Sequence, residues 1–282
     1  MAEMKKQVPV ITLLTDFGLQ DEYVGVMKGV ILSINSGVQV VDITHGLTRH
    51  DVLQAALVVK SAFRYFPINA IHVIVVDPGV GGKRKVLCCK KDGHFFLAPD
   101  NGALSLVIQD GDVDELRAIS NEAYFLKPLS NTFHGRDIFA PVAAHLSKGL
   151  DMARLGPKMT LSDMVTLDFP APFLSARHEL VGTILSVDAF GNLITNIDQE
   201  TFMRFGRRQG LEDVVITLGR SKIQGVSTSY DSVKTGSPVA VFGSRKLLEI
   251  AVNQMDARTC LKARVGQTIR IKLPLPKEGA SR

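Results

Sequence analysis

The sequence predicts an α/β protein with a largely parallel sheet in its N-terminal domain and a smaller, all-β, barrel-like C-terminal domain. In the first half, apolar runs of strand length alternate with segments whose apolar residues recur at helical spacing, the order of a parallel sheet covered on both faces. In the last third, short runs alternate apolar and polar residues, as in an antiparallel sheet or small barrel. With 282 residues, the chain can build two cores.

Three strands and two helices alternate at the start of the chain. The first helix has apolar residues at helical spacing and begins with two acidic residues, which favour a helix N-terminus. The second helix begins at Asp51, a suitable N-cap. In chain order we expect a strand at 8–16, a helix at 21–35, a strand at 38–44, a helix at 51–66 and a strand at 70–79.

Two further strands, "KVLCCKK" and "HFFLAPDNG", precede the last N-terminal helix, "DIFAPVAAHLSKG". Asp137 can cap this helix, and Gly149 can end it. Beyond the helix, the stretch 151–175 contains three prolines and loses the earlier pattern. We therefore expect an α/β domain at 1–165 and an all-β domain at 176–282.

The C-terminal domain is predicted from short strands separated by frequent turns. Several of them alternate apolar and polar residues at period two. The expected strand segments are "LVGTILSVDAFGNLITNI", "DVVITLG", "VSTSYDSV", "PVAVFG", "LLEIAVN" and "TIRIKLP".

Composition argues against several classes of protein. The formal net charge is +5, but Lys and Arg are spread along the chain, so we expect a solvated surface and no nucleic-acid partner. No apolar run approaches the ~18 to 20 residues of a membrane span. The amino terminus lacks the apolar segment of a secretory signal. Three cysteines, two of them adjacent, suit neither a disulfide framework nor a metal site, so we expect a cytoplasmic protein.

Two carboxylates end predicted parallel strands, Asp16 in "LLTDFG" and Asp77 in "VVDPGVGG". Ligands of open parallel sheets bind beyond the carboxyl ends of the strands, although each Asp could equally be a turn or N-cap residue. The glycines of "DPGVGGKR" permit close approach of the backbone to a ligand. The segment matches neither a P-loop nor a dinucleotide fingerprint, and a simple turn also explains it.

His134 lies in "NTFHGRDIFAP", immediately before the last N-terminal helix. A lone histidine is more often structural than catalytic, but one near an Arg and a strand-ending Asp favours a proton-handling role. Arg136 could pair with a carboxylate on the rim of the site. The seven histidines lack metal-binding spacing and the carboxylates form no evident ligand set, so we expect a metal-free site.

In the second domain, Phe190 and Asn192 flank Gly191 in "VDAFGNLITN". A hairpin turn explains the glycine and the amide, while an aromatic ring beside an amide is also a way to hold an adenine. The segment "GSRKLLEIAVN" carries polar residues, including Ser244 and Glu249, either as exposed surface or as part of a site.

Taken together and in order, these motifs resemble the S-adenosylmethionine hydrolase family, also called S-adenosylmethionine hydroxide adenosyltransferases, which are related to the adenosyl-fluoride and adenosyl-chloride synthases. The resemblance runs from about residue 9 to 274. It implies an α/β N-terminal domain, a β-barrel C-terminal domain and a homotrimer whose substrate lies between domains of neighbouring subunits. The motifs are "LLTDFG", "DITH", "VVDPGVGGKR", "APDNG", "TFHGRDIFAP", "FGNLITNI" and "GSRKLLEIAVN".

The resemblance also implies roles for individual residues. Asp77, Arg84 and His134 match the set that distinguishes the hydrolases from their halogenating relatives. Asp16 resembles the ligand of the ribose hydroxyls. The contacts to the rest of the substrate are implied to be Phe190 and Asn192 for the adenine, and Ser244, Glu249 and the backbone at Val252 for the methionine part.

The expected reaction is attack of water on the 5′ carbon of S-adenosyl-L-methionine, which is the substrate, with no cofactor. We expect Arg84 to stabilise the developing hydroxide, His134 to accept or relay its proton, and Asp77 to orient Arg84 and the water. A halide-using adenosyl transferase is the nearest alternative. A nucleoside or S-adenosylmethionine binding module without useful turnover is an alternative of another class.

Overall fold

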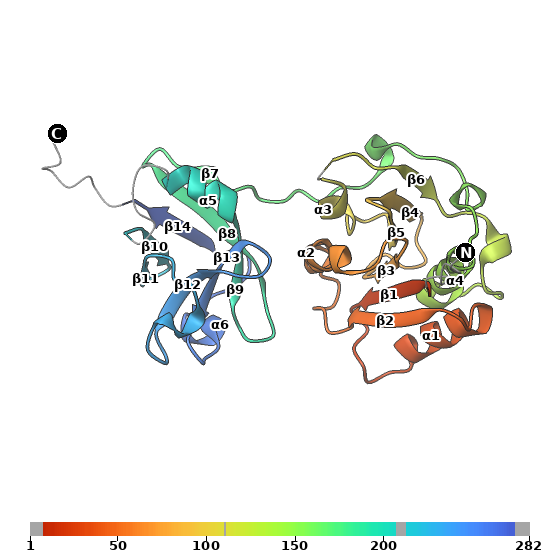
Figure 1. Ribbon diagram of the computed structural model, residues 1–282, viewed down its shortest axis with the longest axis horizontal. Coiled ribbons are helices and arrows are strands. Elements are labelled where there is room, and N and C mark those ends of the chain that lie inside the picture. The colour runs from red at the N-terminus through yellow and green to blue at the C-terminus, as the bar shows by residue number, and fades with distance from the viewer. Residues whose placement is uncertain (1–7, 110, 207–212, 274–282) are drawn as a thin grey trace, which may run out of the picture. The chain divides into compact units, whose positions relative to one another are not determined.

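The computed structural model describes residues 8–109, 111–206 and 213–273. The chain folds into two compact units, which meet in the sequence between Leu167 and Asp168 (Figure 1).

The first unit contains a six-stranded sheet in the order β2-β1-β3-β5-β4-β6. The pairs β1–β2, β1–β3 and β3–β5 are parallel, whereas β4 is antiparallel to both of its neighbours. This confirms the predicted α/β domain with a largely parallel sheet. The strands are β1 (Val10–Thr15), β2 (Gln39–Thr44), β3 (Ile71–Val75), β4 (Val86–Lys91), β5 (His94–Pro99) and β6 (Glu115–Ala118).

Helices cover both faces of this sheet (Figure 1). Apolar side chains of α1 and α4 pack with one set of strand residues, and those of α2 and α3 pack with the other set. The α-helices are α1 (Tyr23–Ile34), α2 (Val52–Ala62), α3 (Ser105–Ile108) and α4 (Ala140–Ser147). Short 3₁₀ turns are η1 (Phe63–Tyr65), η2 (Glu122–Tyr124), η4 (Met152–Arg154) and η5 (Leu161–Asp163).

The two predicted helix caps have opposite outcomes. Asp51 accepts a hydrogen bond from the backbone N of Gln54 at 2.8 Å, so its role as the N-cap of α2 is confirmed. The prediction that Asp137 caps the last helix is wrong, because Asp137 is fully buried inside a π-helical turn, η3 (Gly135–Phe139), that precedes α4. Its carboxylate accepts a hydrogen bond from the backbone N of Ser130 at 2.7 Å and so holds the preceding loop.

The second unit is an antiparallel sheet whose main path runs in the order β11-β10-β14-β8-β9-β13-β12, with β7 paired to β8. A bridge between Ser227 and Val241 joins the segment after β11 to β12, which curls the sheet toward a barrel and confirms that prediction. The strands are β7 (Phe173–Leu174), β8 (Glu179–Val187), β9 (Leu193–Asp198), β10 (Val215–Leu218), β11 (Ser221–Gln224), β12 (Pro238–Phe242), β13 (Leu247–Val252) and β14 (Thr268–Lys272).

The prediction that "VSTSYDSV" forms a strand in this unit is wrong. The segment forms a single 3₁₀ turn, η6 (Tyr230–Ser232), because Ser229 bonds the nearby side chains of Asp231 and Ser232 and so favours a turn. Two helices that the sequence did not predict also occur, α5 (Gln199–Gly206) and α6 (Ala257–Cys260).

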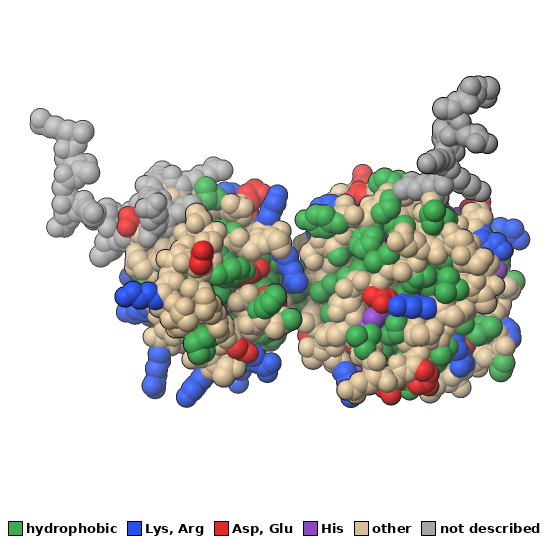
Figure 2. Space-filling view, turned by 60° about the horizontal axis from the view of Figure 1, so that its bottom comes forward, with side chains coloured by type: hydrophobic (Ala, Val, Ile, Leu, Met, Phe, Trp, Pro, Cys, Tyr) green, Lys and Arg blue, Asp and Glu red, His purple; other side chains and the backbone are tan. Residues whose placement is uncertain are grey.

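Three observations concern the surface, the helices and the amino terminus. Figure 2 shows Lys and Arg side chains scattered among other types on the face in view. Among the described residues, no helix has both the length and the apolar character that a bilayer crossing requires. Residues 1–7, on which the expected lack of a secretory signal depends, lie outside the described residues.

Candidate active site

The predicted residues of the N-terminal unit gather at the carboxyl ends of its parallel strands. Asp16 directly follows β1, and Asp77 lies two residues after β3. Both line a cavity of about 300 Å³ together with His134, which comes from the segment that precedes α4. The topology therefore brings three predicted residues from distant parts of the sequence to one cavity.

Asp77 and Arg84 form a closely bonded ion pair. Arg84 Nε donates to Asp77 Oδ1 at 2.6 Å, and Arg84 Nη2 donates to Asp77 Oδ2. The side chain of Arg84 is only 11% exposed and that of Asp77 only 5%. A buried guanidinium needs such a counter-charge, and the two parallel bonds fix the plane of the guanidinium as well as its position.

The glycine-rich turn after β3 packs directly on the segment that leads to His134. Gly81 has a φ of +77°, and a Cβ atom there would lie 2.2 Å from the backbone oxygen of Asn131. Only glycine satisfies both constraints. The turn that carries Arg84 and the segment that carries His134 are thus in backbone contact.

His134 Nδ1 lies 3.2 Å from Arg84 Nη2. Because a guanidinium can only donate, Nδ1 accepts this bond, and the neutral imidazole then carries its hydrogen on Nε2. Burial, and next the charge of Arg84, hold the pKa of His134 below its ordinary value of 6.5. Arg84 Nη1 is buried without a hydrogen-bond partner in the described part of the chain, so one donor of this guanidinium is not satisfied by the protein.

The neighbours of His134 hold its segment in place, and Phe133 also lines the cavity. Arg136 does not reach a carboxylate on the rim; it pairs with Asp137 at 2.6 and 3.0 Å. Phe133 packs edge-on against the ring of Tyr23, with centroids 5.1 Å apart. The ionisable cluster in "HGRD" thus separates into one residue of the cavity and one structural ion pair.

Asp16 has one carboxylate oxygen held by the protein. Its Oδ2 accepts a hydrogen bond from the backbone N of His50 at 2.8 Å. No bond to Oδ1 from the described residues is present, so Oδ1 can accept from a ligand in the cavity.

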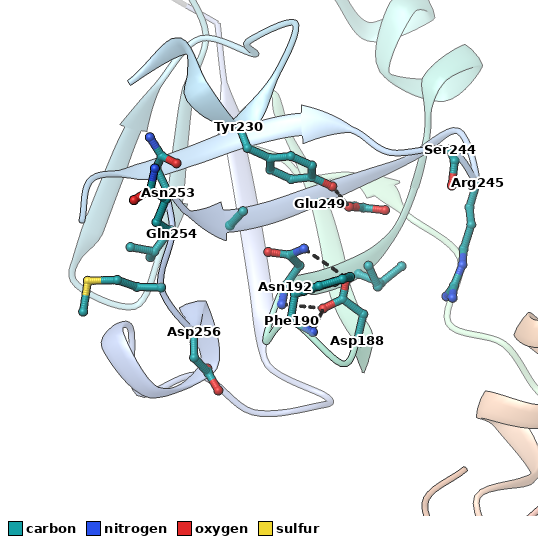
Figure 3. Close-up of a pocket in the computed structure, with 14 residues that line it drawn as sticks. Asp188, Phe190, Asn192, Tyr230, Ser244, Arg245, Glu249, Asn253, Gln254 and Asp256 are labelled. Atoms are coloured by element: carbon teal, nitrogen blue, oxygen red, sulfur yellow. Dashed lines mark hydrogen bonds between the residues drawn. The ribbon is translucent and has the colours of Figure 1, made fainter. Parts of the chain in front are cut away.

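The predicted residues of the C-terminal unit gather around a larger cavity, of about 750 Å³ (Figure 3). Two lie at the β8–β9 turn, one follows β12 and two are on β13. The five residues are Phe190, Asn192, Ser244, Glu249 and Val252.

The hairpin interpretation of "VDAFGN" is correct, and the turn also forms a wall of the cavity. Asp188 accepts hydrogen bonds from the backbone of Phe190 and Asn192 at 2.9 and 2.8 Å, and the Asn192 side chain donates to it at 3.0 Å. Phe190 is 80% exposed, which leaves its ring free to stack on a planar ligand.

Sequence reasoning missed Tyr230, which lines the same cavity and donates a hydrogen bond to Glu249 Oε2 at 2.7 Å (Figure 3). Burial raises the pKa of Glu249, although the bond from Tyr230 lowers it. A lone aromatic residue in the polar run "STSYDS" was the available signal. Gly243 makes room for this carboxylate, since a Cβ at that position would lie 1.8 Å from Glu249 Oε1.

The remaining candidate metal ligands and nucleophiles are described next. Among the described residues, no group of three or more His, Cys, Asp or Glu side chains is arranged to hold a metal ion. Cys88 and Cys89 are buried free thiols, and Cys260 is an exposed one.

Comparison with known proteins identifies the family. Residues 11–156 match the SAM hydroxide adenosyltransferase N-terminal domain, and residues 182–270 match the C-terminal domain. The chain is 33% identical to the (R)-S-adenosyl-L-methionine hydrolase of Thermus thermophilus, over 93% of this chain and 98% of that protein. It is 25% identical to the fluorinase of Nocardia brasiliensis, over 94% and 97% of the two chains.

A solved structure is also similar to this fold. A crystal structure of an uncharacterized conserved protein from Thermotoga maritima superposes with a TM-score of 0.85 at 39% identity, covering 93% of this chain and 99% of the other. The predicted resemblance is confirmed over both units. The chain belongs to the SAM hydroxide adenosyltransferase family.

Proposed function

We propose that this chain hydrolyses S-adenosyl-L-methionine to adenosine and L-methionine. The oxygen of water forms a bond to the 5′ carbon, the bond from that carbon to sulfur breaks, and its electron pair leaves with a neutral thioether. One proton is released. The observation that carries the proposal is the bonded set Asp77, Arg84 and His134, together with the higher identity to named hydrolases than to fluorinases.

Water is the difficult reactant, because its pKa of ~15.7 leaves almost no hydroxide at neutral pH. The sulfonium needs no acid to leave. A buried guanidinium with an unsatisfied donor stabilises negative charge that develops on the water oxygen. In this proposal Arg84 supplies that donor, and Asp77 keeps the guanidinium in place.

The hydrogen-bond pattern suggests a relay for the proton. In the neutral imidazole of His134 the free electron pair is on Nδ1, so Nδ1 accepts the proton from water as its contact with Arg84 lengthens. The imidazolium formed next to a guanidinium is more acidic than an ordinary one, because burial and the charge of Arg84 lower the pKa of His134, and it passes the proton on to solvent. A positioned base of this kind typically contributes about 10² to 10⁴ in rate.

The other predicted residues bind the substrate in this proposal. Asp16 accepts hydrogen bonds from the ribose hydroxyls through its free oxygen and so aims the 5′ carbon. Phe190 and Asn192 contact the adenine. Ser244, Glu249 and the backbone at Val252 contact the methionine part, and no cofactor takes part.

We also propose a homotrimer, in which the cavity of one subunit's C-terminal unit completes the site of its neighbour, and a cytoplasmic location, which three free thiols favour. Light scattering on the purified protein measures the oligomer. Mixing His134→Ala and Glu249→Ala subunits after mild dissociation tests the shared site. Recovery of turnover in the mixture supports a site built from two subunits, and continued inactivity of a properly mixed oligomer contradicts it.

The decisive experiment incubates the protein with S-adenosyl-L-methionine in oxygen-18 water. We expect adenosine labelled at its 5′ oxygen and unlabelled methionine in equal amounts. Testing the two sulfonium epimers separately defines the stereochemistry, which the names of the relatives give as (R).

Two other outcomes would favour the alternatives. Formation of 5′-chloro-5′-deoxyadenosine in chloride, at the expense of adenosine, would identify a halide-using transferase. Retention of intact substrate over hours without methionine release would identify a binding module.

A further inference from the structure

The motif "DITH", at the end of β2, has no role in the function proposed above. Its histidine, His45, is 4% exposed, contacts Thr15 of β1 and is not among the residues that line the cavity. His45 Nδ1 lies 2.8 Å from Thr15 Oγ1, and His45 Nε2 lies 3.1 Å from Asp42 Oδ1. Lys28 Nζ donates to the same Asp42 at 2.6 Å.

His45 Nε2 lies within ion-pair distance of the Asp42 carboxylate, but it is not aligned for a hydrogen bond among the described residues. The negative charge of Asp42 favours the tautomer with its hydrogen on Nε2, and in that tautomer Nδ1 accepts from the Thr15 hydroxyl. The Thr15 oxygen in turn accepts from the backbone N of Phe17 at 3.2 Å. These successive contacts link His45 to Thr15 and Phe17, the two residues that flank Asp16.

The same loop holds the Asp16 turn at two more points. The backbone oxygen of His45 accepts from Gly18 N at 2.8 Å, and His50 N donates to Asp16 Oδ2 at 2.8 Å. Residues 15 to 18 are therefore attached on both sides of the carboxylate to a single loop.

We propose that His45 is a positioning residue for Asp16, with Asp42 orienting its imidazole. The inference rests on the proposed function, in which Asp16 binds the ribose hydroxyls. Loss of the Thr15–His45 contact lets the turn move, so that the free oxygen of Asp16 no longer meets both hydroxyls. His45 itself touches neither substrate nor reacting atoms.

The test compares the binding of two nucleosides by calorimetry to the intact protein. Adenosine has both ribose hydroxyls, whereas 2′,3′-dideoxyadenosine lacks them and cannot report on Asp16. A positioning role predicts that His45→Ala weakens adenosine about tenfold, the lower range for a hydrogen bond to a charged group, and changes dideoxyadenosine less than about twofold. A general structural role would weaken both ligands alike.

Further variants keep the test interpretable if His45→Ala does not fold. Thr15→Val removes only the hydroxyl and should show the same selective loss of adenosine binding. His45→Asn keeps an acceptor near the position of Nδ1 and should retain affinity within about threefold. Thr12→Val is the matched control, because Thr12 is on the same strand and makes an equally short contact, 2.8 Å, to a buried histidine, His72.

The outcomes separate the two proposals. Selective loss of adenosine binding in Thr15→Val but not in Thr12→Val supports the role of His45. Equal losses for both nucleosides, or wild-type adenosine affinity in Thr15→Val, overturn it while leaving hydrolysis intact. A wild-type protein that neither binds adenosine nor consumes S-adenosylmethionine overturns the proposed function, and the role of His45 with it.

Discussion

Replacing Asp77 by Asn tests the core of the proposed mechanism. The amide keeps one acceptor oxygen, so one of the two bonds from Arg84 is lost, which costs about 1.5 to 3 kcal/mol for a bond to a charged group. The guanidinium, whose side chain is 11% exposed, also loses its counter-charge. Breaking a buried ion pair in this way costs about 3 to 5 kcal/mol of unfolding free energy in total.

The same change should lower turnover by about 10²- to 10⁴-fold, because a guanidinium that is no longer held in plane stabilises hydroxide poorly. It should also alter the pH profile. Turnover requires neutral His134, whose pKa already lies below 6.5, and Asp77 raises that pKa. Removing the carboxylate lowers the pKa further, so the acidic limb of kcat/KM moves to lower pH.

Adenosine release, followed by chromatography from pH 4 to 8, measures both effects, and circular dichroism in urea measures stability because the chain has no tryptophan. Asp92→Asn is the matched control. Asp92 is 45% exposed and 3.6 Å from Arg64, so its loss should cost less than about 1 kcal/mol. Turnover in Asp77→Asn equal to that of the control, with an unmoved acidic limb, would refute the assigned roles.

Three further changes have distinct expected results. Arg84→Met should abolish most turnover and move any residual acidic limb to higher pH, since the charge of Arg84 lowers the pKa of His134; a limb that moves downward contradicts this. Tyr230→Phe should raise KM for S-adenosylmethionine about 3- to 10-fold with little change in kcat, because Glu249 loses one hydrogen bond; unchanged KM would exclude Glu249 from the binding contacts. Gly243→Ala should weaken substrate binding, expressed as RT ln of the ratio of KM values, by more than it lowers the unfolding free energy. The reason is that the added methyl displaces the side-chain carboxylate of Glu249 rather than backbone, and a larger loss of unfolding free energy than of binding would contradict that view.

The parts of the fold and site that the sequence predicts are those governed by local pattern. Buried runs that end in Asp16 and Asp77 show where parallel strands end, and parallel strands bring their carboxyl ends to one edge. Asp51 is recognisable as a cap because its bond reaches only three residues along the chain.

Features set by distant contacts could not be predicted in this way. Asp137 has the sequence signature of a cap, but the π-helical turn directs it inward to Ser130. Tyr230 and Glu249 are 19 residues apart and lie on different elements, η6 and β13, so only the tertiary fold brings them together. The role of His45 depends on a hydroxyl 30 residues away on a neighbouring strand.

The backbone contact between Gly81 and Asn131 has a consequence for redesign of the nucleophile. No side chain separates the two segments, so neither can change length without shifting the other. We therefore expect a homologous loop that replaces only one of the two segments to shift the other. An attempt to exchange hydrolytic for halogenating chemistry should replace both segments together.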